Sequence, residues 1–222
     1  MSPRCDLYRN IHKGLRAAMF DTACRFGRLN TEEPEALQQA LDQAQRLLML
    51  MASHVKHEND FVHCAIEARR PGGAQRTADE HREHLETLHA LGLEVAALRR
   101  ALPAERGPLA QRLYRHFVDL AADQLQHMQR EETHNNELLW TLYSDIELQA
   151  LHDRLLAAVE PEARMEALRW MAQALNPQEL AELMGDLQRK APPEAFGAAL
   201  SQVRAQLDEP RWQRLAHALR LS

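Results

Sequence analysis

Apolar residues recur at helical spacing along four long stretches in the first two thirds of the chain. They predict helices over about residues 5–26, 34–69, 77–98 and 109–144. The intervening sequences FGRLNTEEP, RRPGGAQ and LPAERGP contain glycine and proline residues that end helices. Thr77 and Glu80 form a predicted capping box at the start of the third helix. Four long helices with short connections indicate an up-down-up-down four-helix bundle over residues 1–144.

From residue 145 onward the pattern changes to shorter helical segments separated by prolines. These segments cover about residues 146–159, 162–175, 177–190, 193–206 and 208–220. Each proline suits the first turn of a new helix, because that position needs no backbone N–H donor. We therefore predict an all-α protein with a C-terminal helical extension over residues 145–222. Its apolar residues are expected to pack against the bundle, or to contact a second copy in a homodimer or another protein.

Polar residues interrupt the apolar face of each predicted bundle helix. His54 and Glu58, and likewise His127 and Glu131, are four residues apart, so each pair shares one helix face. His12 lies on the apolar stripe of the first helix. On the third helix either His81 or His84, or both, can face inward, and the spacing does not separate them. The candidate metal ligands are therefore His12, His54, Glu58, His81, His84, His127 and Glu131.

Composition narrows the possible functions. Twelve of the 222 residues are histidine, whereas the net charge of −5 and the lack of basic runs argue against a nucleic-acid partner. The first residues lack an apolar core and the longest apolar run is short, so we expect neither secretion nor membrane insertion. Three cysteines without paired spacing lead us to expect a reducing cytoplasm. The GxSxG, phosphate-loop and HExxH motifs are all missing from the sequence. The inward histidines and glutamates are thus the leading chemical feature.

Imidazoles and carboxylates in a helical core favour a bound metal. Each unpaired buried polar group costs about 1–3 kcal/mol, and an unpaired carboxylate costs more. Metal ions remove that cost, and divalent iron accepts both ligand types. Two six-coordinate ions offer about twelve positions in all. If all five histidines bind, both glutamates bridge the ions and one oxygen is shared, one position stays open. If only one of His81 and His84 binds, two positions stay open.

These motifs resemble the haemerythrin-like family of HHE cation-binding proteins over about residues 5–144. The resemblance rests on His12 in IHKGLR, on SHVKHENDF, on DEHREHLETL and on HMQREE. It implies a four-helix bundle with two irons, bridged by oxo or hydroxo, and a small diatomic ligand such as O2 or NO. Oxygen-carrying members have His-x4-Asp in the last motif and His-x3-His on the third helix. This chain has His-x3-Glu and His-x2-His there, which is closer to the iron-sensing F-box protein and the iron-centre repair proteins of the family.

Several other residues remain candidates for roles beside the ligands. His134 follows His127 by seven residues and could face the site, whereas His57, His63, His89 and His116 lie off the central line, at the surface or behind the ligands. Glu132 and Asp60 could orient imidazoles, although a solvated face suits them better.

We expect a non-haem di-iron protein that binds or senses O2, NO or iron without turning over an organic substrate. One alternative is a di-iron oxidase or peroxidase. Ferritin-like oxidases use Glu-x-x-His on two helices, and here only Glu131 and His134 have that spacing. The other alternative is a purely helical interaction module.

Overall fold

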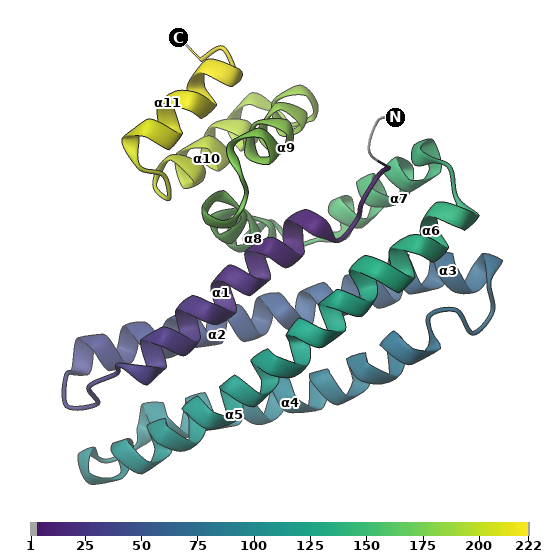
Figure 1. Ribbon diagram of the computed structural model, residues 1–222. Coiled ribbons are helices and arrows are strands. Elements are labelled where there is room, and N and C mark those ends of the chain that lie inside the picture. Colours follow the sequence, from purple (N-terminus) through teal and green to yellow (C-terminus); the bar gives the residue numbers. More distant parts are fainter. Residues whose placement is uncertain (1–3, 222) are drawn as a thin grey trace. The chain divides into compact units, whose positions relative to one another are not determined.

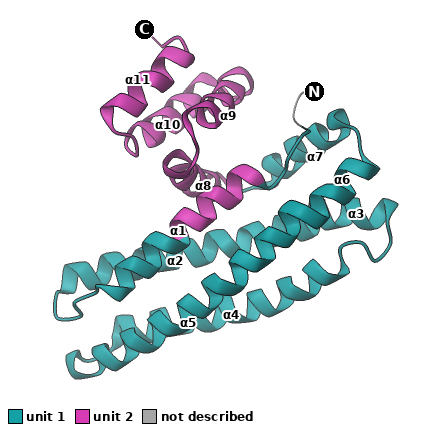
Figure 2. Ribbon diagram, in the orientation of Figure 1, with its two compact units in different colours: residues 1–8, 19–159 teal, residues 9–18, 160–222 magenta. Residues whose placement is uncertain are grey.

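The computed structural model describes residues 4–221, and every regular element among them is helical (Figure 1). The all-α prediction is therefore confirmed. Contacts divide the chain into two compact units, residues 1–8 with 19–159 and residues 9–18 with 160–222 (Figure 2). The first helix, α1 (Arg9–Gly27), runs through both units. We predicted a C-terminal extension from residue 145, but the helix α7 (Asp145–Ala158) belongs to the first unit by its contacts. A domain boundary at residues 144 and 145 stays a prediction.

Three long helices dominate the first unit. Figure 1 shows α2 (Pro34–His57), α4 (Gln75–Arg100) and α5 (Pro103–Arg130) alongside one another, and contacts join α2 to α4 and α4 to α5. Their facing sides are apolar at helical spacing, and each fully buried leucine contributes about 1.5–3 kcal/mol. The buried residues include Leu41, Leu47, Met51, Leu91, Leu98, Leu113 and Phe117.

Two helix starts differ from the sequence prediction. The helix α5 begins at Pro103, inside the predicted loop 102–108, because proline suits the first helical position and Glu105 Oε2 accepts the Leu102 N–H at 3.0 Å. The helix α4 begins at Gln75, so Thr77 lies inside its first turn. The Thr77 hydroxyl donates to the Ala74 carbonyl at 3.1 Å, and the predicted capping box at Thr77 is wrong.

Two π-helical turns interrupt helices that the sequence predicts to be continuous. After α2, the segment η1 (Glu58–His63) leads into α3 (Cys64–Arg69). After α5, the segment η2 (Glu131–Asn135) leads into α6 (Asn136–Leu142). A π turn holds more residues than an α turn and is frequent at functional sites. Each π turn here begins at one of the two predicted glutamate ligands.

An apolar cluster covers the end of the first unit beyond the π turns. Its residues come from the start of the chain, η1, α3, the turn before α4, α6 and α7. They are Tyr8, Val62, Ile66, Ala74, Leu139 and Leu148. Tyr143 Oη donates to the Ala65 carbonyl at 2.7 Å and ties the loop after α6 to α3. The π turns therefore lie within the packed interior of the unit.

The second unit contains four short helices: α8 (Pro161–Ala174), α9 (Pro177–Lys190), α10 (Pro193–Arg204) and α11 (Glu209–Ala218). Together with α7 they confirm the five predicted segments to within two residues at each end. Prolines occupy the first turns, and the side chains of Asn176 and Asp208 cap α9 and α11. Their core includes Leu168, Ala172, Leu180, Met184, Ala199 and Val203.

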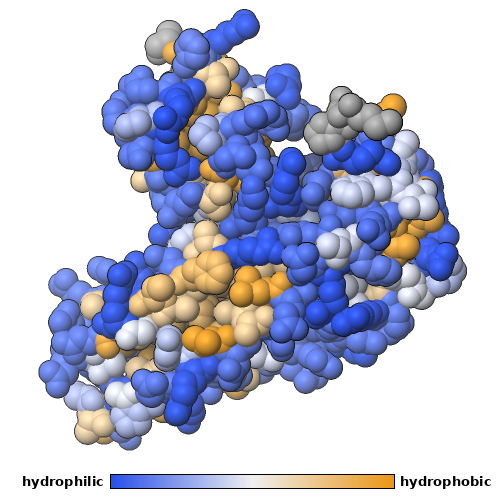
Figure 3. Space-filling model, in the orientation of Figure 1, coloured by the Kyte–Doolittle hydropathy of each residue, from blue (hydrophilic) through white to orange (hydrophobic). Residues whose placement is uncertain are grey.

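The surface is mostly hydrophilic on the face that Figure 3 shows, with an apolar patch on the first unit. Large apolar side chains exposed on this unit include Phe20, Met49, Leu93 and Val118. Among residues 4–221 no helix has both the length and the apolar character that crossing a membrane requires.

Candidate metal centre

The two predicted His-x3-Glu pairs lie in the interior of the first unit. Glu58 and Glu131 are 3% and 0% exposed, although both are carboxylates. His54 Nε2 lies 3.2 Å from Glu58 Oε1, and His127 Nε2 lies 3.2 Å from Glu131 Oε1. The shared helix face that the spacing predicts is therefore confirmed for both pairs.

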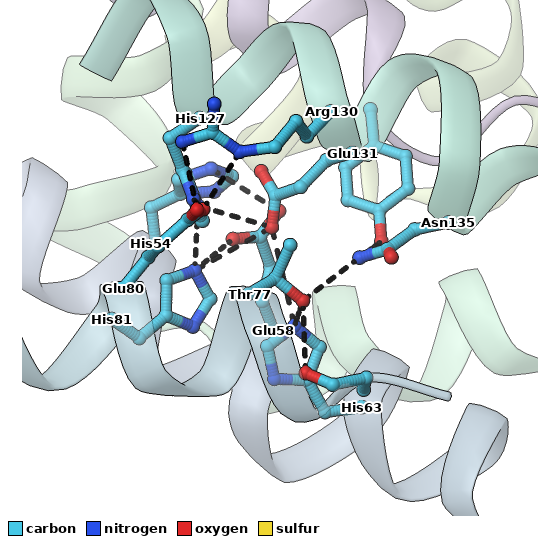
Figure 4. Close-up of polar contacts among 12 residues, drawn as sticks. His54, Glu58, His63, Thr77, Glu80, His81, His127, Arg130, Glu131 and Asn135 are labelled. Carbon is cyan, nitrogen blue, oxygen red and sulfur yellow. Dashed lines mark hydrogen bonds and ion pairs between the residues drawn. The ribbon is translucent and has the colours of Figure 1, made fainter. Parts of the chain in front are cut away.

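His81 on α4 brings the two pairs together. Its Nε2 atom lies 2.9 Å from His127 Nε2, 3.4 Å from Glu58 Oε2 and 3.5 Å from Glu131 Oε1 (Figure 4). Ligand atoms of Glu58, His81, His127 and Glu131 all lie within 4.8 Å of one another, and all four residues are buried. Helices α4 and α5 and the two π turns thus direct two imidazoles and two carboxylates to one point.

The spacing of these atoms fits a shared metal ion. Nitrogen and oxygen ligands bind transition metals at about 2.0–2.2 Å, so neighbouring ligands of one ion are about 3 Å apart. The separations of 2.9–3.5 Å around His81 Nε2 fall close to this value. Ligand atoms of His54, Glu58 and Glu131 also lie within 4.8 Å of one another. Both carboxylates therefore belong to two neighbouring ligand groups, as bridging ligands of an ion pair would.

Hydrogen bonds on the far side of two imidazole rings orient them toward this point. His81 Nδ1 lies 2.7 Å from Asn59 Oδ1, and His127 Nδ1 lies 2.8 Å from Glu80 Oε2. Because these oxygens are acceptors, each Nδ1 carries the donated proton and each Nε2 faces the carboxylates. Arg130 Nη2 in turn binds Glu80 Oε1 at 2.8 Å. A carboxylate behind an imidazole is a common arrangement at metal sites.

The charges of the group are strongly coupled. Burial, and then the Glu58 carboxylate, act to raise the pKa of Glu131, but hydrogen bonds from His127 and His81 lower it to about 2. Burial acts to lower the pKa of His81, but hydrogen bonds to Glu131 and Glu58 raise it to about 9. Two buried carboxylates therefore hold positive charge beside them. A divalent cation can take the place of these protons.

The structure separates the two histidines that spacing left open. His81 joins the ligand group, whereas the His84 ring packs edge-on against His127 with ring centroids 4.8 Å apart. Burial, followed by His127 and His81, lowers the pKa of His84 to about 4, so this imidazole is neutral at pH 7. Ligation by His84 stays a prediction. His12 is fully buried on α1, among the residues that count with the second unit, and its ligation also stays a prediction.

The π turns change which nearby residues are buried. His134, a candidate from its spacing, is exposed, and the next residue, Asn135, is buried instead. His63, expected at the surface or behind the ligands, is 5% exposed and stacks on His81 with ring centroids 4.7 Å apart. Asp60 binds Lys56 at 2.6 Å on the exposed side, as a solvated face requires.

Sequence reasoning missed Asn59 and Glu80, which orient the two imidazoles. Each contacts a histidine on another helix, and no spacing within one helix reveals such a pair. His57 is buried for a structural reason, because its ring bonds the backbone carbonyls of Ser53 at 2.6 Å and Ala158 at 3.2 Å.

Comparisons with known proteins leave the function open. No protein-family model matches the chain, and no solved structure matches it. The chain is similar to Ninein of Mus musculus, with 31% identity over 156 residues. That match covers 70% of the chain, and the chain spans about 6% of the length of Ninein. We therefore infer the function from the buried histidines and glutamates.

Proposed function

We propose that the chain is a non-haem di-iron protein of haemerythrin-like type, with α1, α2, α4 and α5 forming a four-helix bundle around the metal pair. The observation that carries the proposal is the convergence of His81, His127, Glu58 and Glu131 in the interior. Two carboxylates at this depth are stable only with a cationic partner. Imidazole and carboxylate ligands suit iron, zinc and manganese, and the choice of iron comes from the family resemblance.

His81 and His127 would hold one ion together with Glu58 and Glu131, and His54 would hold a neighbouring ion with the same two carboxylates. His12 on α1 stays a predicted ligand of that pair, and so does His84 on α4. Glu80 and Asn59 fix the ligating tautomers of His127 and His81 through their Nδ1 atoms. Glu58, His81, His127 and Glu131 are all buried, and their burial excludes bulk water from these ligands.

An iron pair held in this way would keep one open position with His84 bound and two without it, and such a position would bind a small diatomic such as O2 or NO. We therefore propose a protein that binds or senses such a ligand, or iron itself, rather than an enzyme with an organic substrate. The three cysteines, Cys5, Cys24 and Cys64, are all free thiols, which supports our placement of the protein in the cytoplasm.

Metal content of the purified protein tests the proposal. We expect about two irons per chain after expression in iron-supplemented medium. The double variant with Glu58→Ala and Glu131→Ala should lose both irons. The control variant His134→Gln changes an exposed residue of η2, the π turn that begins at Glu131, and should keep both irons. Metal should also raise the melting temperature above that of chelated protein, since it binds only the folded state. A folded wild-type protein without metal, or a double variant that retains both irons, would overturn the proposal.

A further inference from the structure

His63 is a third imidazole beside the ligand group that contains His81 and His127. Its Nε2 atom lies 4.0 Å from Glu131 Oε1, and its ring lies nearly parallel to that of His81, at an angle of 15° (Figure 4). The π turn η1 places it there, five residues after Glu58. Its side chain is 6% exposed, so it belongs to the interior of the first unit.

Among residues 4–221, the His63 ring makes one hydrogen bond. Nε2 lies 3.2 Å from Thr77 Oγ1, while the Thr77 hydroxyl proton is directed to the Ala74 carbonyl. Nε2–H of His63 therefore donates to Thr77. The other ring nitrogen, Nδ1, is buried and makes no hydrogen bond to any residue that the structure describes. Such a weakly held, buried imidazole is poorly explained by a structural role alone.

The position of Nε2 is compatible with coordination. Two ligands of one ion are about 3 Å apart when adjacent and about 4.2 Å apart when opposite, given ligand distances near 2.1 Å. The 4.0 Å between His63 Nε2 and Glu131 Oε1 lies within this range, but His63 is not among the residues whose ligand atoms all lie within 4.8 Å of one another, so its ring has to move toward the group to bind. A neutral imidazole can place its proton on either nitrogen, so a shift of that proton to Nδ1 frees Nε2 to bind without a change of charge.

We propose that His63 is an exchangeable ligand of the ion held by His81 and His127. The inference rests on the proposed metal pair. His63 bound to that ion would occupy the one position that the other ligands leave open on it, and His63 hydrogen-bonded to Thr77 would leave that position to a small external ligand. His63 and an external ligand at that ion would therefore compete, which makes the external affinity depend on a residue of the chain itself.

Azide binding to the iron-loaded protein, followed by optical titration, tests this competition. His63→Leu removes the competitor, so azide should bind about tenfold tighter or more, while the iron content stays near two per chain. Thr77→Val removes the alternative partner of His63, so azide should bind more weakly than in the wild type. His134→Leu, an exposed histidine of the same unit, is the matched control and should leave the azide affinity unchanged.

Unchanged or weaker azide binding in His63→Leu would overturn the competition. If that variant folds poorly, His63→Gln is the second test, because glutamine keeps a polar side chain of similar size but coordinates iron poorly. These outcomes differ from a failure of the proposed function, in which the wild-type protein holds no iron at all. Iron-loaded wild type with normal azide binding and no response to either His63 variant refutes this inference and leaves the metal pair standing.

Discussion

Glu80 offers a sharp test of how the site orients its ligands. Its Oε2 atom accepts a hydrogen bond from His127 Nδ1 at 2.8 Å, and its Oε1 atom binds Arg130 at 2.8 Å. In Glu80→Gln the side chain keeps its length and one acceptor oxygen but loses its charge. The loss of a partner behind a ligating histidine typically lowers metal affinity by about 10–100-fold, which is about 1.4–2.8 kcal/mol. Because the glutamine oxygen still accepts from His127, we expect a value near tenfold.

Competition with a chromophoric chelator measures this change. The matched control is Asp79→Asn, since Asp79 precedes Glu80 in the chain but pairs with Arg82 on the exposed side of α4. The control should keep the wild-type metal affinity. Melting of the chelated proteins shows separately how much the Glu80 contacts contribute to metal-free stability. If Glu80→Gln binds metal within twofold of the wild type, the orientation of His127 by Glu80 does not govern affinity, and our reasoning is refuted.

Two further predictions concern stability away from the centre. Met184 is fully buried in the second unit, so Met184→Ala should lower the free energy of unfolding of that unit by about 2–5 kcal/mol in urea titrations, while iron content stays at the wild-type level. A loss of iron would show that the metal site depends on this core. Hydrogen bonds from Arg69, and then from Ser144, lower the pKa of Glu147 from 4.5 to about 2. The ionised Glu147 carboxylate therefore stabilises the folded state fully above pH 4.5, and this stabilisation is lost as the pH falls toward 2. The stability difference between wild type and Glu147→Gln should therefore shrink over that range, and a difference independent of pH would contradict this account.

The sequence was informative about the site where local geometry decides the contacts. His54 with Glu58, and His127 with Glu131, are each separated by four residues, and an α-helix places such residues on one face whatever surrounds it. The repetition of this pair on two apolar faces predicted buried metal ligands, and the structure buries both glutamates together. The helical segments after residue 145 were predictable for a similar reason, because prolines mark their first turns.

The remaining features depend on contacts between helices or on irregular turns. The π turns at Glu58 and Glu131 shift the register of every later residue in their helices, so α-helical spacing favoured His134 and passed over His63. No local pattern reveals a π turn, since it is stabilised by the packing around it. The contact of His81 Nε2 with His127 Nε2 likewise depends on the facing helix, and no spacing within α4 reveals it.

Anomalous diffraction at the iron absorption edge, from crystals of the iron-loaded protein, tests the central claim most directly. Our account predicts two peaks about 3.5–4 Å apart, both beside the carboxylates of Glu58 and Glu131, with one next to His81 and His127. The absence of a peak between these carboxylates in protein shown to contain iron, or iron bound only at the surface, would contradict it.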